Sequence, residues 1–215
     1  MRKMLATVMG MFVLMPGLSL GAVMPDQLVR DNTTKIIALL KANREVYEKD
    51  RKKLYTMIYR EVLPHFDFKV MSRAVLGRHW RRANEDQRKH FSNEFRDLLV
   101  RTYATVLLKY TNEKIIYLPF KGKPDDKTAV VRIEVKPAGG GPNIPIHYSF
   151  YHKNSSWKVY DVTVDGVSLV TNYRSTYASR IRNEGIDALI ASMAKANKTK
   201  AGGASKSAKN EARAK

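Results

Sequence analysis

The stretch "TAVVRIEVK", residues 128–136, decides the fold because the hydrophobic period of the chain changes there. Val131, Ile133 and Val135 alternate with charged residues, and a period of two predicts a β-strand with one buried face. Working outward, similar runs predict strands at 114–119, 144–152 and 157–164. The segments between them are rich in Gly, Pro, Asn and Asp, as turns between antiparallel neighbours require.

Helical periodicity flanks this block of strands on both sides. On the N-terminal side it predicts helices at 25–40, 46–63, 68–76 and 84–110, with Asp67 and Asn84 as N-caps. On the C-terminal side Ser168 is expected to cap a helix, and a last helix follows at 185–196. This order predicts an α+β fold. We expect a curved four-stranded antiparallel sheet covered by N- and C-terminal helices that lie across its concave face.

The first 22 residues have the pattern of a secretory signal peptide. Arg2 and Lys3 precede an apolar run at 4–15, and Ser19-Leu20-Gly21 satisfies the small-x-small rule for cleavage. The run is too short to span a bilayer, which takes about 18 apolar residues or more. We therefore expect residues 1–22 to be removed on export and residues 23–196 to form one domain.

The C-terminal residues 197–215 are rich in Lys, Ala, Gly and Ser, a composition that predicts a disordered basic tail. Of the net charge of +19, two charges leave with the signal peptide and six lie at 195–215, so eleven remain on the folded part. Such a surface favours anionic partners. An exported polyanion-binding protein is therefore one alternative, although export argues against nucleic acid as its partner.

Motifs for catalysis and for metal binding are weak in this chain. A serine hydrolase of the elbow type needs Gly-x-Ser-x-Gly, and the stretch 166–170, Gly-Val-Ser-Leu-Val, lacks the second glycine. Ser168 is better interpreted as a helix cap, and a hydrolase that uses it is a less favoured alternative. The five histidines lack metal-ligand spacing and there is no cysteine, so no metal and no cofactor is expected.

Two longer segments carry a family resemblance. Residues 63–110, "LPHFDFKVMSRAVLGRHWRRANEDQRKHFSNEFRDLLVRTYATVLLKY", and residues 157–190, "WKVYDVTVDGVSLVTNYRSTYASRIRNEGIDALI", resemble the MlaC or toluene-tolerance family of periplasmic phospholipid carriers. The resemblance implies a fold related to the nuclear-transport-factor-like cone, with a cavity for acyl chains. It also implies a carrier, expected to be a monomer, that docks transiently. The carrier would shuttle phospholipid between an outer-membrane lipoprotein complex and an inner-membrane ABC transporter complex, maintaining outer-membrane lipid asymmetry.

The candidate lipid contacts are apolar residues on the inner face of the predicted sheet and on the apolar stripes of the predicted helices above it. On the sheet they are Val131, Ile133, Ile146, Tyr148, Phe150, Val162 and Val164. Near or on the helices they are Val70, Met71, Phe95, Leu98, Leu99, Tyr103, Val167, Leu169, Val170 and Tyr173. A filled core would use the same residues, so periodicity alone leaves both interpretations open. Arg101 and Arg174 are the candidates for meeting the lipid phosphate.

Overall fold

Five antiparallel strands form one sheet, in the order in which they follow along the chain. The computed structural model describes residues 23–154 and 156–211, and the predicted signal peptide lies outside them. The strands are β1 (Lys114–Tyr117), β2 (Thr128–Lys136), β3 (Ile144–Lys153), β4 (Ser156–Val164) and β5 (Val167–Ser168). The α+β class and the antiparallel sheet are as predicted. The strand count is five rather than four because the two residues of β5 pair back onto β4.

The register of the sheet gathers apolar residues on one face. Tyr148 lies opposite Val131 on β2 and opposite Val162 on β4, so the three residues form a row across the sheet. A bulge shifts the register before Phe150, which then pairs with Val159. Bulges bend a strand and increase its twist. The apolar face is therefore curved, and it needs a second layer to cover it.

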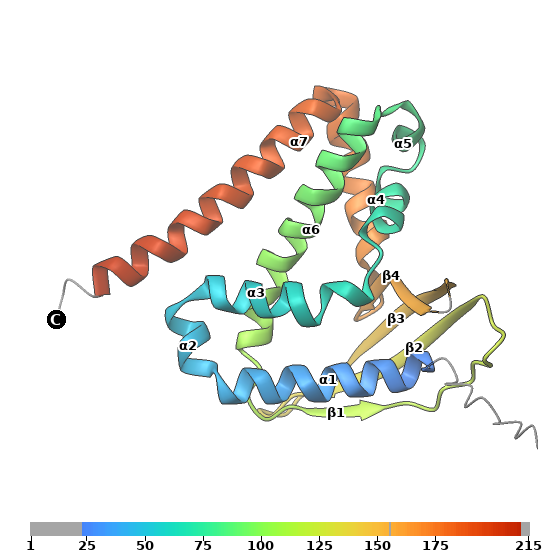
Figure 1. Ribbon diagram of the computed structural model, residues 1–215, viewed down its shortest axis with the longest axis vertical. Helices are drawn as coiled ribbons and strands as arrows, with labels where there is room; N and C mark the ends of the chain where they lie inside the picture. Colours follow the sequence, from blue (N-terminus) through green and yellow to red (C-terminus); the bar gives the residue numbers. More distant parts are fainter. Residues whose placement is uncertain (1–22, 155, 212–215) are drawn as a thin grey trace, which may run out of the picture.

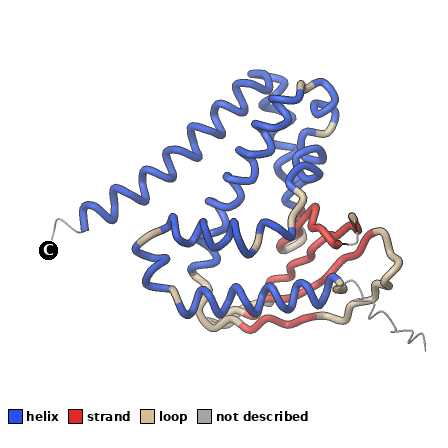
Figure 2. The backbone as a smooth tube through the Cα atoms, viewed as in Figure 1, coloured by secondary structure: helices blue, strands red, loops and turns tan. Residues whose placement is uncertain are grey.

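The N-terminal helices supply that layer. They are α1 (Pro25–Ala42), α2 (Arg44–Lys49) and α3 (Arg51–Glu61), followed by a short 3₁₀ helix, η1 (Leu63–His65). The single helix predicted at 46–63 is wrong, because the backbone is extended at Asp50 and its side chain caps α3 by accepting from the Lys52 N–H at 2.9 Å. α1 runs along the sheet (Figure 2). Its buried Val29 packs in the same cluster as Val131 and Phe150.

The remaining helices form a bundle beside the sheet. They are α4 (Phe68–Leu76), α5 (Arg78–Arg82), α6 (Glu85–Leu108) and α7 (Leu169–Glu211), and α4, α6 and α7 pack on one another (Figure 1). α6 packs chiefly on α7 and α4, whereas α1 is the helix that lies along the sheet. α6 has two apolar stripes, since Phe91 and Phe95 pack into the bundle while Val100 and Ala104 pack against the N-terminal helices.

The predicted helix caps are confirmed. Asp67, Asn84 and Ser168 each accept a hydrogen bond from the backbone N–H three residues further on, at 3.0, 2.9 and 3.0 Å. The Gln87 side chain accepts from the Asn84 N–H at 3.0 Å, which completes a capping box. Gly77 ends α4 with a φ of 52°, a conformation that favours glycine.

The last helix extends beyond the end that was predicted for it at residue 196. α7 bends at Gly185, where φ is 82°, and then continues to Glu211 rather than ending at 196. Asn197, the first residue of the predicted tail, is only 4% exposed. Its amide donates to the Glu94 side chain at 2.7 Å, so residue 197 belongs to the packed part of the molecule. Over residues 23–154 and 156–211, no helix combines the length and the apolar character that crossing a membrane requires.

Candidate functional site

A cavity of about 450 Å³ lies between α1 and the apolar face of the sheet. This volume falls within the range of ligand pockets, roughly 300–1,000 Å³. The apolar part of the α1 wall is Leu28, Val29, Ile36, Ile37 and Leu40. The sheet wall includes Ile115, Ile133, Ile146, Tyr148 and Phe150. We call this space the α1–sheet cavity, and nearly all of its surface is apolar.

One end of the α1–sheet cavity opens to solvent. Val106 at the end of α6 and Ile144 at the start of β3 both line the cavity, yet they are 61% and 39% exposed. Large apolar residues that are exposed and also line a cavity mark its mouth. Lys109 and Glu113, just beyond the end of α6, are the charged residues of the lining. Arg44 supports this end of α6 by donating to the Leu108 carbonyl at 2.8 Å.

Polar contacts hold α1 in place over the cavity. Asn32 on α1 and His65 of η1 both line the cavity, and Asn32 Nδ2 lies 2.7 Å from His65 Nε2. Burial lowers the pKa of His65, and the charge of Lys158 lowers it further, so the imidazole is neutral at pH 7 and can accept from Asn32. Lys35, almost one turn further along α1, pairs with Glu61 at 2.5 Å.

Tyr148 brings a hydroxyl to the sheet wall of the cavity. Burial raises its pKa to about 12, with a smaller effect from Tyr117. The phenol therefore stays protonated and neutral at physiological pH. Tyr117 also receives the Arg30 guanidinium of α1 over its ring, at 4.3 Å from the ring centroid. This cation–π contact ties α1 to β1.

The structure brings only part of the predicted contact set to the cavity. Four of the predicted sheet residues line it: Ile133, Ile146, Tyr148 and Phe150. The other apolar residues near them pack in the sheet core instead: Val131, Val162, Val164 and Leu169. Val167 is 54% exposed on β5. Parity along the strands therefore identifies the correct face of the sheet, but not which part of that face is covered.

The predicted helical contacts lie elsewhere, in the bundle. The bundle core and its edge include Met71, Phe95, Leu98, Leu99, Tyr103, Val170 and Tyr173. This core is filled, since Met71 and Phe95 have no exposed surface and the Phe95 ring meets the Tyr173 ring edge-on at 5.2 Å. Val70 lies in the first turn of α4, outside the cavity lining. None of these eight residues lines the α1–sheet cavity.

The two arginines predicted to meet a phosphate also lie away from this cavity. The Arg101 guanidinium stacks over the Tyr55 ring of α3, with its carbon 5.3 Å from the ring centroid. The Arg174 guanidinium lies against Gly77, where an added Cβ would be 3.2 Å from Arg174 Nε. The helical spacing of Val29, Ile36 and Leu40 is visible in the sequence and underlies the helix predicted at 25–40. The spacing of apolar residues along a helix does not show whether they face a filled core or a cavity.

Ser168 lies in a hydrogen-bonded turn at the start of α7. Its Oγ donates to Asp161 Oδ2 at 2.5 Å and accepts from the Thr171 N–H at 3.0 Å. Asp161 Oδ1 accepts from the Val170 N–H at 3.1 Å. A nucleophilic serine needs a base that removes its proton, usually histidine, and the described contacts of Ser168 include no histidine. The arrangement is that of a helix cap.

Comparison with known proteins places this architecture in a family. The family model described as MlaC protein matches residues 30–195. The chain belongs to the MlaC family. The match runs from within α1 past the bend of α7, so it includes the sheet wall of the α1–sheet cavity and the α1 wall apart from Leu28 and Val29.

Three individual proteins are similar to this chain over most of their length. The intermembrane phospholipid transport system binding protein MlaC of Haemophilus influenzae is 28% identical, over 79% of this chain and 80% of that protein. Toluene tolerance protein ttg2D of Pseudomonas putida is 29% identical, over 83% of this chain and 84% of that protein. A phospholipid-binding protein from Ralstonia solanacearum, solved in complex with a phospholipid, matches with a TM-score of 0.75 at 26% identity. That match covers 82% of this chain and 98% of the solved one.

Proposed function

We propose that the chain is a periplasmic phospholipid carrier that holds acyl chains in the α1–sheet cavity. The observation that carries the proposal is the cavity itself, with a volume of about 450 Å³ and a nearly continuous apolar lining. Two relatives support it by their names: a phospholipid transport system binding protein and a phospholipid-binding protein solved with a phospholipid. The cargo is the only ligand in this proposal, and no cofactor is part of it.

The dimensions of the cavity suit an acyl chain laid lengthwise. Its lining on α1 extends from Leu28 to Leu40, a distance of about 18 Å at 1.5 Å per residue. One leaflet of a bilayer contributes about 15 Å of hydrocarbon, half of the roughly 30 Å core. A chain that enters at the mouth beside Val106 and Ile144 can therefore run beneath α1 toward Asn32 and His65.

This orientation leaves the head group at the mouth. Lys109 is exposed there, and we propose it as the cation that meets the phosphate, in place of Arg101 and Arg174. The neighbouring Arg44 adds positive charge at the end of α6 through its bond to the Leu108 carbonyl. An anionic head group thus lies near two cations, Lys109 and Arg44, and one carboxylate, Glu113, while its chains stay out of water.

A carrier is needed because lipid does not cross water freely. Two acyl chains contain about 30 methylenes, and at roughly 0.8 kcal/mol each their exposure would cost on the order of 25 kcal/mol. An apolar cavity replaces one apolar environment with another, so transfer between a membrane protein and the carrier can be nearly balanced. Release into solvent would incur the whole cost. We therefore propose that lipid moves only while the carrier is docked, between an outer-membrane and an inner-membrane complex, and so maintains lipid asymmetry.

Catalysis is not part of the proposal. The Ser168 hydroxyl is engaged in the cap of α7, with Asp161 as its acceptor, and its contacts among the described residues include no histidine. The basic surface fits docking on acidic partners as well as it fits a polyanion-binding function. The polyanion-binding alternative is not supported by any structural feature comparable to the cavity.

The test is native mass spectrometry of the purified protein, combined with extraction into organic solvent. We expect phospholipid to accompany the folded protein at a stoichiometry of one or a few per chain. Delipidated protein should take up lipid again from vesicles. Protein that stays free of lipid after purification and after incubation with vesicles would contradict the proposal. Salt dependence separates the alternative, because lipid held by apolar burial should remain bound at 0.5 M salt, whereas a polyanion would dissociate.

A further inference from the structure

Two arginine–tyrosine stacks lie one helical turn apart where α3 packs against α6. The Arg96 guanidinium carbon is 5.4 Å from the centre of the Tyr59 ring, and that of Arg101 is 5.3 Å from the centre of the Tyr55 ring. Both tyrosines come from α3, at positions i and i+4 of one helix face. Both arginines come from α6. The same local arrangement is therefore present twice, and the two copies can be compared directly.

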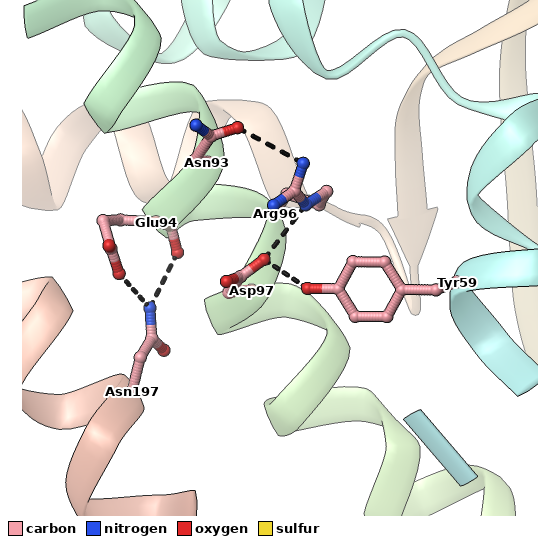
Figure 3. A network of polar contacts seen from close by, with 6 residues as sticks. All are labelled: Tyr59, Asn93, Glu94, Arg96, Asp97 and Asn197. Carbon is pink, nitrogen blue, oxygen red and sulfur yellow. Dashed lines mark hydrogen bonds and ion pairs between the residues drawn. The ribbon is translucent and has the colours of Figure 1, made fainter. Parts of the chain in front are cut away.

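The first stack includes a carboxylate. Arg96 Nε donates to Asp97 Oδ1 at 3.0 Å, and the Tyr59 hydroxyl donates to the same oxygen (Figure 3). Burial and the Asp97 charge raise the pKa of Tyr59, so the phenol keeps the proton that it donates. The side chains of Arg96 and Asp97 are 32% and 28% exposed. A partly buried carboxylate thus satisfies both the guanidinium and the neighbouring phenol.

The second stack has no carboxylate from the described part of the chain. Nε and Nη1 of Arg101 are buried and have no hydrogen-bond partner. Arg51, one turn before Tyr55 on α3, also has a buried Nη1 without a partner. Leaving a charged donor buried and unpaired is unfavourable, and an oxyanion would remove that cost. Arg51, Tyr55 and Arg101 are each only partly buried as whole residues, so solvent reaches their edge.

We infer that Arg51, Tyr55 and Arg101 form a carboxylate-binding site on the α3–α6 seam. The ligand takes the position at the second stack that Asp97 occupies at the first. Its carboxylate comes from an aspartate or glutamate of a docking protein or from a small free acid. Along α6, Arg101 lies about 140° around the helix axis from the cavity residue Val106, at 100° per residue. The inference therefore does not depend on the lipid-carrier function.

The first experiment measures binding of a fluorescent hexaglutamate peptide to the full chain at 50 mM salt, by anisotropy. Arg101→Met should weaken binding about ten- to a hundredfold, the range for losing one charge-assisted hydrogen bond. The control is Lys52→Met, which removes an equal charge from an exposed position on α3. It should change binding less than about twofold, as expected for a screened surface charge. Equal losses in the two variants would mean general attraction to a basic surface and would overturn the inference.

A second measurement distinguishes the sources of the carboxylate and checks folding. In this measurement, the melting temperatures of the parent chain and of Arg101→Met are recorded with sodium acetate. If acetate raises the melting temperature of the parent chain but not of Arg101→Met, and the peptide does not bind, the site is assigned to free acids. Failure of both peptide and acetate would overturn the inference. In the absence of ligand, Arg101→Met should melt no lower than the parent chain because it removes unpaired buried donors. A marked fall in melting temperature would show that Arg101 is a structural residue and would also overturn it.

Discussion

Replacing Asp67 by asparagine should reduce the free energy of unfolding by about 2 kcal/mol at neutral pH and by far less at pH 2. Asp67 joins α4 to the sheet, because its carboxylate accepts from Lys153 Nζ at 2.8 Å and from the Tyr151 hydroxyl. The Asp67 side chain is 10% exposed. Burial alone would raise the pKa of Asp67, but the hydrogen bonds from Lys153, Tyr151 and the Val70 N–H outweigh it. Together they hold the pKa at about 2 instead of 3.8.

The magnitude follows from that difference, since each unit of pKa corresponds to about 1.4 kcal/mol. The folded-state pKa lies below the unfolded value. The stabilisation is therefore fully present above about pH 5 and is lost as the pH falls through 3.8 toward 2. Asparagine also caps helices well, so Asp67→Asn retains the bond to the Val70 N–H and removes mainly the charge.

The assay for Asp67→Asn is urea-induced unfolding at pH 7, 5, 3 and 2, with the parent chain measured in parallel. The difference in unfolding free energy should be constant from pH 7 to pH 5 and should shrink steadily below. Lys153→Gln, which removes the strongest partner, should give a smaller loss with the same pH dependence. An equal loss at pH 2 and pH 7, or no loss at pH 7, would refute the reasoning about this carboxylate.

Three further predictions distinguish residues that line the cavity from residues that only support the fold. Ile146→Trp adds bulk to the cavity wall, so it should reduce co-extracted phospholipid by about half or more while the circular dichroism spectrum stays unchanged. Leu99→Ala, in the bundle core, should cost about 2–5 kcal/mol in urea unfolding, and a fall in lipid per folded chain would contradict its placement. Ser168→Ala should cost about 1 kcal/mol through loss of the α7 cap. A loss of lipid from Ser168→Ala at unchanged melting temperature would instead indicate a direct role in binding.

The local features of this fold could be predicted because neighbouring residues determine them. Asp67, Asn84 and Ser168 begin helices by hydrogen bonds that reach three residues along the chain, and the sequence contains both partners. Strand parity likewise placed Ile133 and Ile146 on the apolar face. The break at Asp50 was missed because apolar spacing continues across it, although Asp50 is itself a good N-cap.

The position of the cavity could not be predicted, because it depends on which helix covers the sheet. Periodicity shows that α6 has apolar faces but does not show that Phe95 packs on α7 while Val100 packs against the N-terminal helices. The apolar stripe of α1 was identified, yet Ile36 and Leu40 have the same spacing whether they fill a core or line a cavity. Arg101 was selected for its charge, and only the packing of α3 on α6 shows that it faces Tyr55.

The most direct test of the central claim is photo-crosslinking from single positions to bound lipid. A photoreactive benzoylphenylalanine at Ile37, in the α1 wall of the cavity, is compared with one at Leu98, at the edge of the bundle core. Each protein is loaded from phospholipid vesicles, irradiated and analysed by intact-protein mass spectrometry. The carrier account predicts a phospholipid-sized mass increase at position 37 and none at position 98. An adduct at 98 but not at 37 would contradict it.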